Sequence, residues 1–161
     1  MQGSGPALNR IHSPATEPGG APLLCRGICR ALGQLGYVSL LEFPLANGRR
    51  ADVIALGRDG EVMIVEVKSS LADFRSDRKW PDYWEFCDRL YFAVGEDFPR
   101  DALPAECGLL VADGYGAAVL RDPAPRPLAA ARRKALTLRF GVIAASRLHR
   151  LTDPGAGELS L

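Results

Sequence analysis

The sequence is poor in the residues that commonly bind structural metal ions. It has only two histidines, and its four cysteines include no pair in the Cys-x-x-Cys spacing of zinc knuckles and thioredoxin-like redox sites. Cys25 and Cys29 are four residues apart, so on a helix they would share a face, where small apolar packing is more common than metal binding. We therefore expect buried free thiols and no structural zinc.

Long apolar runs and a strong net charge are also absent. No stretch approaches the ~20 apolar residues of a membrane span, and the first 20 residues lack the apolar core of a signal peptide. We therefore expect a cytoplasmic protein with no membrane contact. The net charge of +1 does not by itself indicate a nucleic-acid binder. The charge is unevenly placed, however, because residues 126–150 contain seven basic residues and no acidic one.

The length and composition indicate a single domain. The 161 residues, 47% of them hydrophobic, can bury one core and leave little room for a second. Residues 1–20 are rich in Gly, Pro, Ser and Thr and are expected to be disordered. The domain would then cover residues 21–150, followed by a flexible tail over 151–161. Nothing in the composition indicates the oligomeric state.

Hydrophobic periodicity predicts an α/β fold. Helices are expected over residues 21–36 and 128–148, and strands over 37–45, 50–56, 61–67, 90–94, 108–112 and 117–120. In the last helix, Leu136, Phe140 and Ile143 would face inward, with Leu148 as a further candidate. The order is αβββαβ with additions: a mixed central sheet flanked by helices, with a C-terminal basic helix.

A further helix is expected between the third and fourth strands. Ser70 and Asp73 match the start of a capping box. The helix would therefore begin near Leu71 and run, with or without a break at Pro81, to Cys87.

Three charged residues lie within apolar, strand-like runs. Asp52 lies in one run, and Glu66 and Lys68 end the next, where alternation puts them on one face. Asp59-Gly60 between the runs is typical of a hairpin turn, which would place Asp52 and Glu66 on adjacent strands. Converging carboxylates repel one another unless a cation neutralises them, and hard oxygen ligands suit Mg²⁺ or Mn²⁺. Lys68 would hold or polarise the attacking water, as in metal-dependent phosphodiester hydrolysis.

A simpler reading of the same charges also exists. Charges at strand ends are often a solvated edge or an ordinary ion pair, worth roughly 0–1 kcal/mol when exposed. The context favours a site, because a hairpin, an apolar strand and a helix rich in charged and aromatic residues follow one another.

Asp52 with Glu66-Val67-Lys68 resembles the PD-(D/E)XK nuclease superfamily, although Ala51 rather than proline precedes the aspartate. More closely, five segments resemble the MmcB family of bacterial DNA-repair proteins: NGRRAD (47–52), VEVKSS (65–70), KWPDY (79–83), CD (87–88) and ARRKALTLRF (131–140). This resemblance covers about residues 36–147. It implies a restriction-endonuclease-like fold and a role in DNA damage repair, and it says more about the pathway than about the substrate.

Glu42 and Lys79 are auxiliary candidates. A carboxylate on the strand before Asp52 could complete a metal shell, but the face of Glu42 depends on the Asn47-Gly48 loop. A two-residue loop pairs Glu42 with Val53 and points it away from Asp52, whereas a three-residue loop pairs it with Ile54 on the face of Asp52.

Candidate DNA contacts surround the predicted site: Arg49, Arg50, Lys79, Trp80, Tyr83, Arg132, Arg133 and Lys134. The arginines and lysines would bind phosphates, and the aromatic residues would stack on an unpaired base. Each has an ordinary alternative, because paired arginines in a turn are usually solvated and aromatic residues at this spacing usually pack between helix and sheet. The basic helix could equally present a solvated face.

The sequence thus predicts a Mg²⁺-dependent DNA endonuclease acting in repair. Asp52 and Glu66 would be metal ligands, the Val67 carbonyl a candidate third ligand, and Lys68 would position the water. The alternative is a non-catalytic DNA-binding adaptor that keeps the nuclease scaffold and contacts other repair proteins. The form of DNA, and whether RNA is also bound, stay open.

Overall fold

The computed structural model describes residues 20–155. The disorder expected for residues 1–19 and the flexibility expected for 156–161 therefore lie outside the described residues. Within residues 20–155, no helix has the length and apolar character needed to cross a membrane.

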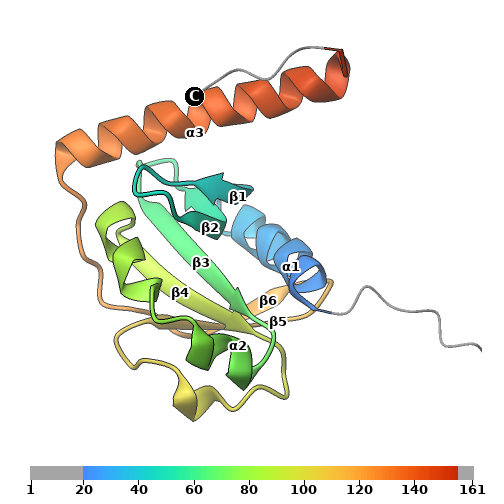
Figure 1. Ribbon diagram of the computed structural model, residues 1–161, viewed down its shortest axis with the longest axis vertical. Coiled ribbons are helices and arrows are strands. Elements are labelled where there is room, and N and C mark those ends of the chain that lie inside the picture. Colours follow the sequence, from blue (N-terminus) through green and yellow to red (C-terminus); the bar gives the residue numbers. More distant parts are fainter. Residues whose placement is uncertain (1–19, 156–161) are drawn as a thin grey trace, which may run out of the picture.

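A six-stranded mixed sheet forms the centre of the protein, with its strands in sequence order (Figure 1). The strands are β1 (Val38–Pro44), β2 (Arg50–Leu56), β3 (Val62–Lys68), β4 (Arg89–Val94), β5 (Gly108–Ala112) and β6 (Ala117–Arg121). Neighbouring strands are antiparallel, except that β3, β4 and β5 run parallel to one another. These three strands consequently end at the same edge of the sheet.

Helix α1 (Ala21–Gln34) covers one face of the sheet. Its buried residues Ile28 and Leu32 pack in one apolar cluster with Val53 and Val65. Gly27 lets the helix approach the β5–β6 turn closely, because a Cβ atom there would lie 2.0 Å from the Asp113 carbonyl oxygen. This contact ties the start of α1 to the edge at which β5 ends.

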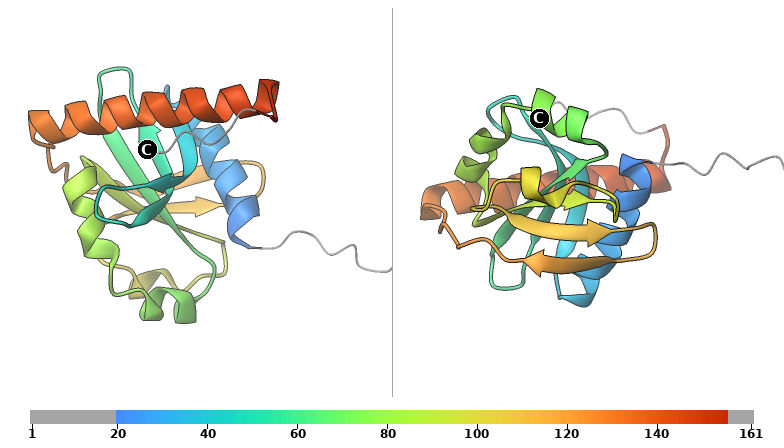
Figure 2. Two further views of the ribbon diagram at one scale, coloured as in Figure 1. Left: turned by 45° about the horizontal axis from the view of Figure 1, so that its top comes forward. Right: turned by 90° about the horizontal axis from the view of Figure 1, so that it is seen from below.

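Helices α2 (Leu71–Ser76) and α3 (Ala130–Thr152) and the 3₁₀ helix η1 (Trp80–Phe86) cover the other face. Helix α3 buries Leu136, Phe140 and Ile143, as predicted. The expectation for Leu148 is wrong, since its side chain is 63% exposed. The last turns of α3 run past the sheet (Figure 2). The helix also continues to Thr152, into the segment expected to be a flexible tail.

The segment between β3 and β4 departs from the prediction. Instead of one helix reaching Cys87, α2 ends at Ser76, Asp77 is extended (φ −87°, ψ 95°), and η1 starts at Trp80. Pro81 lies in the first turn of η1, a position that proline tolerates, so it begins a new helix there rather than continuing α2. The break sets the position of Asp77.

The turn and cysteine predictions are confirmed. Gly48 and Gly60 have φ values of 78° and 85°, which glycine adopts without strain. All four cysteines are free thiols, of which Cys29 is half-buried and the others are buried. All six strands, β1 to β6, lie within two residues of their predicted bounds.

Candidate functional site

Asp52 and Glu66 lie where β2 and β3 separate. The paired register of the two strands ends at Val53 and Val65. Beyond that point, side chains replace the backbone ladder: the Val67 amide donates to Asp52 Oδ2 at 2.8 Å, and the Asp52 amide donates to Glu66 Oε1 at 3.2 Å. We call this arrangement of Asp52 and Glu66 the carboxylate fork. It brings together the two residues that the sequence predicts as metal ligands.

The electrostatics of the fork are unfavourable for two negative charges. Glu66 is 3% exposed, and its burial, followed by the nearby Asp52 carboxylate, raises the pKa of Glu66 to about 8. Burial also raises the pKa of Asp52, although the hydrogen bond from the Val67 amide opposes the change. Since the pKa of Glu66 lies above neutral pH, the fork retains a proton there unless a cation takes its place.

Lys68 is a buried ammonium fixed beside the fork. Its side chain lies on the same sheet face as Glu66, as predicted, and Nζ donates to Asp77 Oδ2 at 2.7 Å. Burial by itself would lower the pKa of Lys68, but the hydrogen bond and the charges of Asp77 and Glu66 outweigh it, so the pKa is raised. Lys68 is therefore charged at neutral pH.

Asp77 is a site residue that sequence reasoning did not select. The extended conformation after α2 directs its carboxylate to Lys68, and the Lys79 amide donates to Asp77 Oδ1 at 2.9 Å. Burial opposes ionisation, but these hydrogen bonds hold the pKa of Asp77 below its usual range. The signal in the sequence is Pro81, which marks a helix break close to the end of α2.

Glu42 follows neither predicted register. Leu41 pairs with Val53 and Phe43 with Ala51, so Glu42 lies opposite Asp52 at a positive φ of 50°. The connection between β1 and β2 spans residues 45–49, which is longer than either loop considered. The exposed carboxylate pairs with Arg50 Nε at 2.5 Å. It is close enough to raise the pKa of Asp52, so it stays an auxiliary candidate.

The sequence profile of a family described as "DNA repair protein MmcB-like" matches residues 12–155. This chain belongs to the MmcB-like family. A solved structure described as "SPO1766 protein of unknown function from Silicibacter pomeroyi" is similar, with 47% sequence identity and a TM-score of 0.85. The match covers 88% of this chain and 98% of that chain. No curated protein matches the chain.

Around the fork of this MmcB-like protein, three of the predicted phosphate contacts are accessible. Arg49 pairs with Asp82 at 2.9 Å and Arg50 with Glu42, while Lys79 is exposed. Exposed pairs of this kind are worth roughly 0–1 kcal/mol. A phosphate could therefore replace either acidic partner at little cost.

The two predicted stacking residues belong to the core instead. Tyr83 is 7% exposed and its hydroxyl donates to the Arg50 carbonyl at 3.0 Å, so no face of its ring is free for a base. Half-buried Trp80 packs edge-on against Phe92, with ring centroids 5.7 Å apart. The base stacking predicted for Tyr83 is wrong, because burial against the sheet occupies the ring, and Trp80 likewise serves the core.

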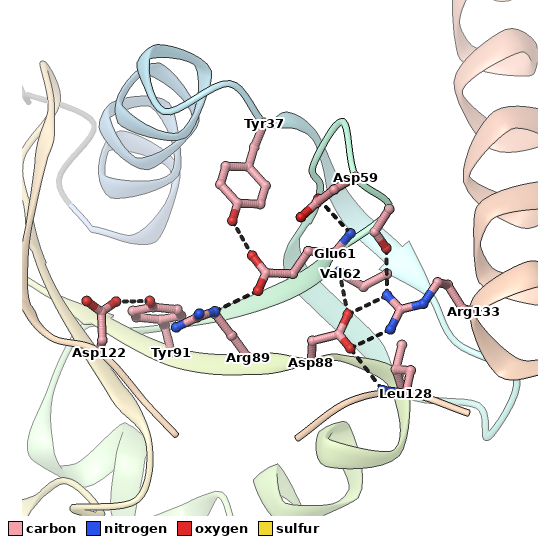
Figure 3. A network of polar contacts seen from close by, with 11 residues as sticks. Tyr37, Asp59, Glu61, Val62, Asp88, Arg89, Tyr91, Asp122, Leu128 and Arg133 are labelled. Atoms are coloured by element: carbon pink, nitrogen blue, oxygen red, sulfur yellow. Dashed lines mark hydrogen bonds and ion pairs between the residues drawn. The ribbon is translucent and has the colours of Figure 1, made fainter. Parts of the chain in front are cut away.

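Arg133, predicted as a DNA contact, has a structural role. Its guanidinium forms two 2.7 Å bonds with the Asp88 carboxylate and a third with the Gly60 carbonyl (Figure 3). Asp88 is 4% exposed and also accepts from the Val62 and Leu128 amides. Asp88 thus joins β3, β4 and α3 through Arg133, and the DNA contact predicted for Arg133 stays a prediction.

The rest of the basic helix is also partly committed to the fold. Arg139 and Arg147 donate to β1 carbonyl groups, at Pro44 (2.8 Å) and Leu41 (2.6 Å). Arg132 lies 3.6 Å from Glu85 Oε2, with its guanidinium 4.9 Å from the Phe86 ring. Lys134 is exposed. The positive charge of α3 is therefore largely explained by its docking onto the sheet.

Proposed function

We propose that this protein is a Mg²⁺- or Mn²⁺-dependent DNA endonuclease of the PD-(D/E)XK nuclease superfamily that acts in DNA repair. The observation that carries the proposal is the carboxylate fork, in which the half-buried Asp52, the buried Glu66 and the buried ammonium of Lys68 converge where two strands separate. Burying such charges is costly, and a protein with only a structural use for these positions would gain nothing from them. Membership of a DNA repair family supports DNA as the substrate.

The donor atoms at the fork suit a hard divalent cation. Within residues 20–155, no group of three or more His, Cys, Asp and Glu side chains is arranged to hold a metal ion. Asp52 and Glu66 would supply two carboxylate ligands and the Val67 carbonyl a third, which is enough for Mg²⁺ because that ion usually keeps several waters. When bound, the ion would activate water and neutralise charge on the phosphate. It would also offset the burial and, after it, the repulsion from Asp52 that together raise the pKa of Glu66.

Lys68 would act as a fixed positive charge rather than as a base. Asp77 holds Lys68 Nζ in place and keeps it protonated, so the ammonium can orient a water or stabilise the extra negative charge of the pentacoordinate phosphorus. Arg49, Arg50 and Lys79 would bind the flanking phosphates. Binding would require only the exposed ion pairs Arg49–Asp82 and Arg50–Glu42 to separate.

A non-cleaving DNA-binding adaptor is the second candidate. It is favoured because the charged groups of the fork already have hydrogen-bond partners within the protein. Both carboxylates accept from backbone amides, and Lys68 donates to Asp77. Such a module would bind DNA and other repair proteins without hydrolysis.

Cleavage of labelled single-stranded, duplex, mismatched and branched DNA with Mg²⁺ or Mn²⁺ distinguishes the two candidates. We expect products from wild type, and a loss of at least about 100-fold in Asp52→Asn and Lys68→Ala, as for removal of a group that stabilises transition-state charge. Asp101→Asn, at an exposed position in the short 3₁₀ helix Arg100–Ala102, is the matched control.

Products that persist in Asp52→Asn would show that the fork is not the catalytic centre. Absence of cleavage by wild type, with DNA binding retained, would place the adaptor first.

A further inference from the structure

Tyr115 is the one exposed Phe, Tyr or Trp among residues 20–155, and its side chain is 78% exposed. The turn between β5 and β6 holds it outward: Asp113 Oδ1 accepts from the Tyr115 and Gly116 amides at 2.7 and 2.9 Å. Arg26 of α1 donates from Nε to the Gly114 carbonyl at 2.9 Å, which anchors the turn. An exposed ring is thus presented on a rigid support.

This turn lies at the same edge of the sheet as the carboxylate fork. Lys68 pairs with Val94, and Val94 pairs with Val111, so the ends of β3 and β5 are two strand spacings apart, about 10 Å. The chain then turns through Tyr115 into β6. Lys68 faces the α2 side of the sheet, where it contacts Asp77, whereas the turn is held by Arg26 of α1, which covers the other face. A strand of nucleic acid leaving the fork would reach the turn by passing over this edge from one face of the sheet to the other.

The surroundings of Tyr115 suit a flat ligand attached to a negative charge. The ring borders a hollow of about 680 Å³ that is also lined by Val111 and Ala117. The Arg26 guanidinium lies 5.9 Å from the ring centroid. Two acids line the hollow, but Glu96 pairs with Arg100 at 2.8 Å and Asp113 is used by the turn. Asp113 keeps its negative charge, but its Oδ1 accepts from the two turn amides, while Arg26 Nε donates to the Gly114 carbonyl.

We propose that Tyr115 and Arg26 form a platform for an unpaired DNA base, with the ring stacking on the base and the guanidinium neutralising an adjacent phosphate. Bases within a duplex are already stacked on their neighbours, so the platform selects single-stranded or unpaired DNA. Tyr83 and Trp80 cannot take this role, because their rings pack in the core. The inference rests on the proposed function for the identity of the ligand as DNA, and not for cleavage.

The test is equilibrium binding by fluorescence anisotropy in EDTA, in an Asp52→Asn background that keeps the DNA intact. The probes are a labelled oligothymidylate, an abasic strand of the same length and a duplex. Stacking on one base corresponds to a loss of about 5- to 150-fold in affinity for oligothymidylate in Tyr115→Ala. Tyr115→Phe keeps an aromatic face and should bind as wild type does. Leu120→Ala, at a 51% exposed position on β6, is the matched control.

The abasic strand and the duplex should bind Tyr115→Ala as tightly as the parent. Arg26→Gln, whose amide can still donate a hydrogen bond, should lower the slope of log affinity against log salt by about one. Unchanged binding of oligothymidylate to Tyr115→Ala, or an equal loss on the abasic strand or the duplex, overturns the platform. An unchanged salt slope in Arg26→Gln contradicts the phosphate contact.

Cleavage is measured separately, so the two proposals fail independently. Stacking by Tyr115 without any cleavage would contradict the proposed nuclease activity and support the platform as part of a DNA-binding module. If Tyr115→Ala changes neither DNA binding nor the rate and substrate choice of cleavage, only the platform proposal is contradicted.

Discussion

The Asp88 carboxylate joins three segments that are distant in sequence. It binds the guanidinium of Arg133 on α3, the amide of Val62 at the start of β3, and the amide of Leu128 in the connection to α3 (Figure 3). Removing one partner of such a buried pair leaves an uncompensated charge, which is the costly change. The role of Asp88 is therefore stability rather than chemistry.

Asp88→Ala should lower the free energy of unfolding by about 3–5 kcal/mol. Asp82→Ala, which breaks the exposed pair with Arg49, should cost less than about 1 kcal/mol. Urea unfolding of both variants measures the difference. Equal costs would mean that the Asp88 network adds no more than a surface pair.

The same network predicts a loss of stability in acid. Burial opposes ionisation of Asp88, but Arg133 and the two amides outweigh it, so the pKa of Asp88 is lowered in the folded protein. A lowered carboxyl pKa contributes stability above the unfolded value of about 3.9, and this contribution disappears as the pH falls through the folded value. The difference in unfolding free energy between wild type and Asp88→Ala should shrink below about pH 4. A constant difference from pH 6 down to pH 2 would contradict this prediction.

Glu66 predicts the opposite trend and a link to metal binding. Its pKa of about 8 exceeds the unfolded value of about 4.3, so ionising Glu66 destabilises the metal-free protein as the pH rises toward 8. Glu66→Gln should therefore unfold at a higher temperature than wild type at pH 9, and the gain should be smaller at pH 5.

Mn²⁺ should raise the unfolding temperature of wild type more at pH 8.5 than at pH 6.5, because the cation competes with the proton on Glu66. Calorimetry across this range, with Glu66→Gln as the variant that does not respond, measures the effect. An equal response of both proteins to Mn²⁺ would place the metal elsewhere.

At the scale of elements, α3 shows that basic residues of a helix can serve its docking onto a sheet. Its inner face packs through Leu136, Phe140 and Ile143, and arginines on its flanks donate to the carbonyl groups of edge strand β1. An edge strand exposes unpaired backbone groups, and covering them with hydrogen-bond donors also protects the edge from pairing with another chain.

Phe140→Ala and Leu148→Ala test how α3 is docked. Phe140 is 8% exposed, with its ring 6.1 Å from that of Phe43, so its truncation should cost about 3–5 kcal/mol in unfolding free energy. Leu148 is largely exposed, and its truncation should change stability by less than about 0.5 kcal/mol. Comparable costs in urea unfolding would mean that α3 buries a different face in solution.

At the scale of the whole molecule, accessible positive charges lie in two places, around the fork and on α3. Arg49, Arg50 and Lys79 surround the candidate site, whereas Arg132 and Lys134 are exposed on α3. The net charge of +1 therefore conceals two separate basic surfaces. Arg49 and Arg50 are paired with exposed acids, and a phosphate can take the place of either acid.

The salt dependence of DNA binding distinguishes the two surfaces. The double change Arg50→Gln and Lys79→Gln should lower the slope of log affinity against log salt by about two, because each side chain would neutralise one phosphate. The matched double change Arg132→Gln and Lys134→Gln should leave the slope nearly unchanged. The reverse result would move the DNA from the fork to α3.

Local sequence patterns were sufficient for the strands and for the centre of the site. The hairpin at Gly60 and the shared face of Glu66 and Lys68 follow from turn chemistry and a two-residue period, and each involves only neighbouring residues. The Asp52–Glu66 pairing followed from the same hairpin. These features could be predicted because backbone sterics and alternation do not depend on the rest of the chain.

Tertiary structure alone decided which charged and aromatic residues are free to act. Arg133 was predicted to contact DNA, but its guanidinium is hydrogen-bonded to Asp88, 45 positions away in the sequence. The ring of Tyr83 is buried in the core. Asp77 became the partner of Lys68 through a helix break, while Tyr115 stayed exposed on a turn anchored by α1. The physical reason is that burial and ion pairing depend on contacts between distant segments, whereas the sequence by itself determined the strands, the turns and the convergence of Asp52, Glu66 and Lys68.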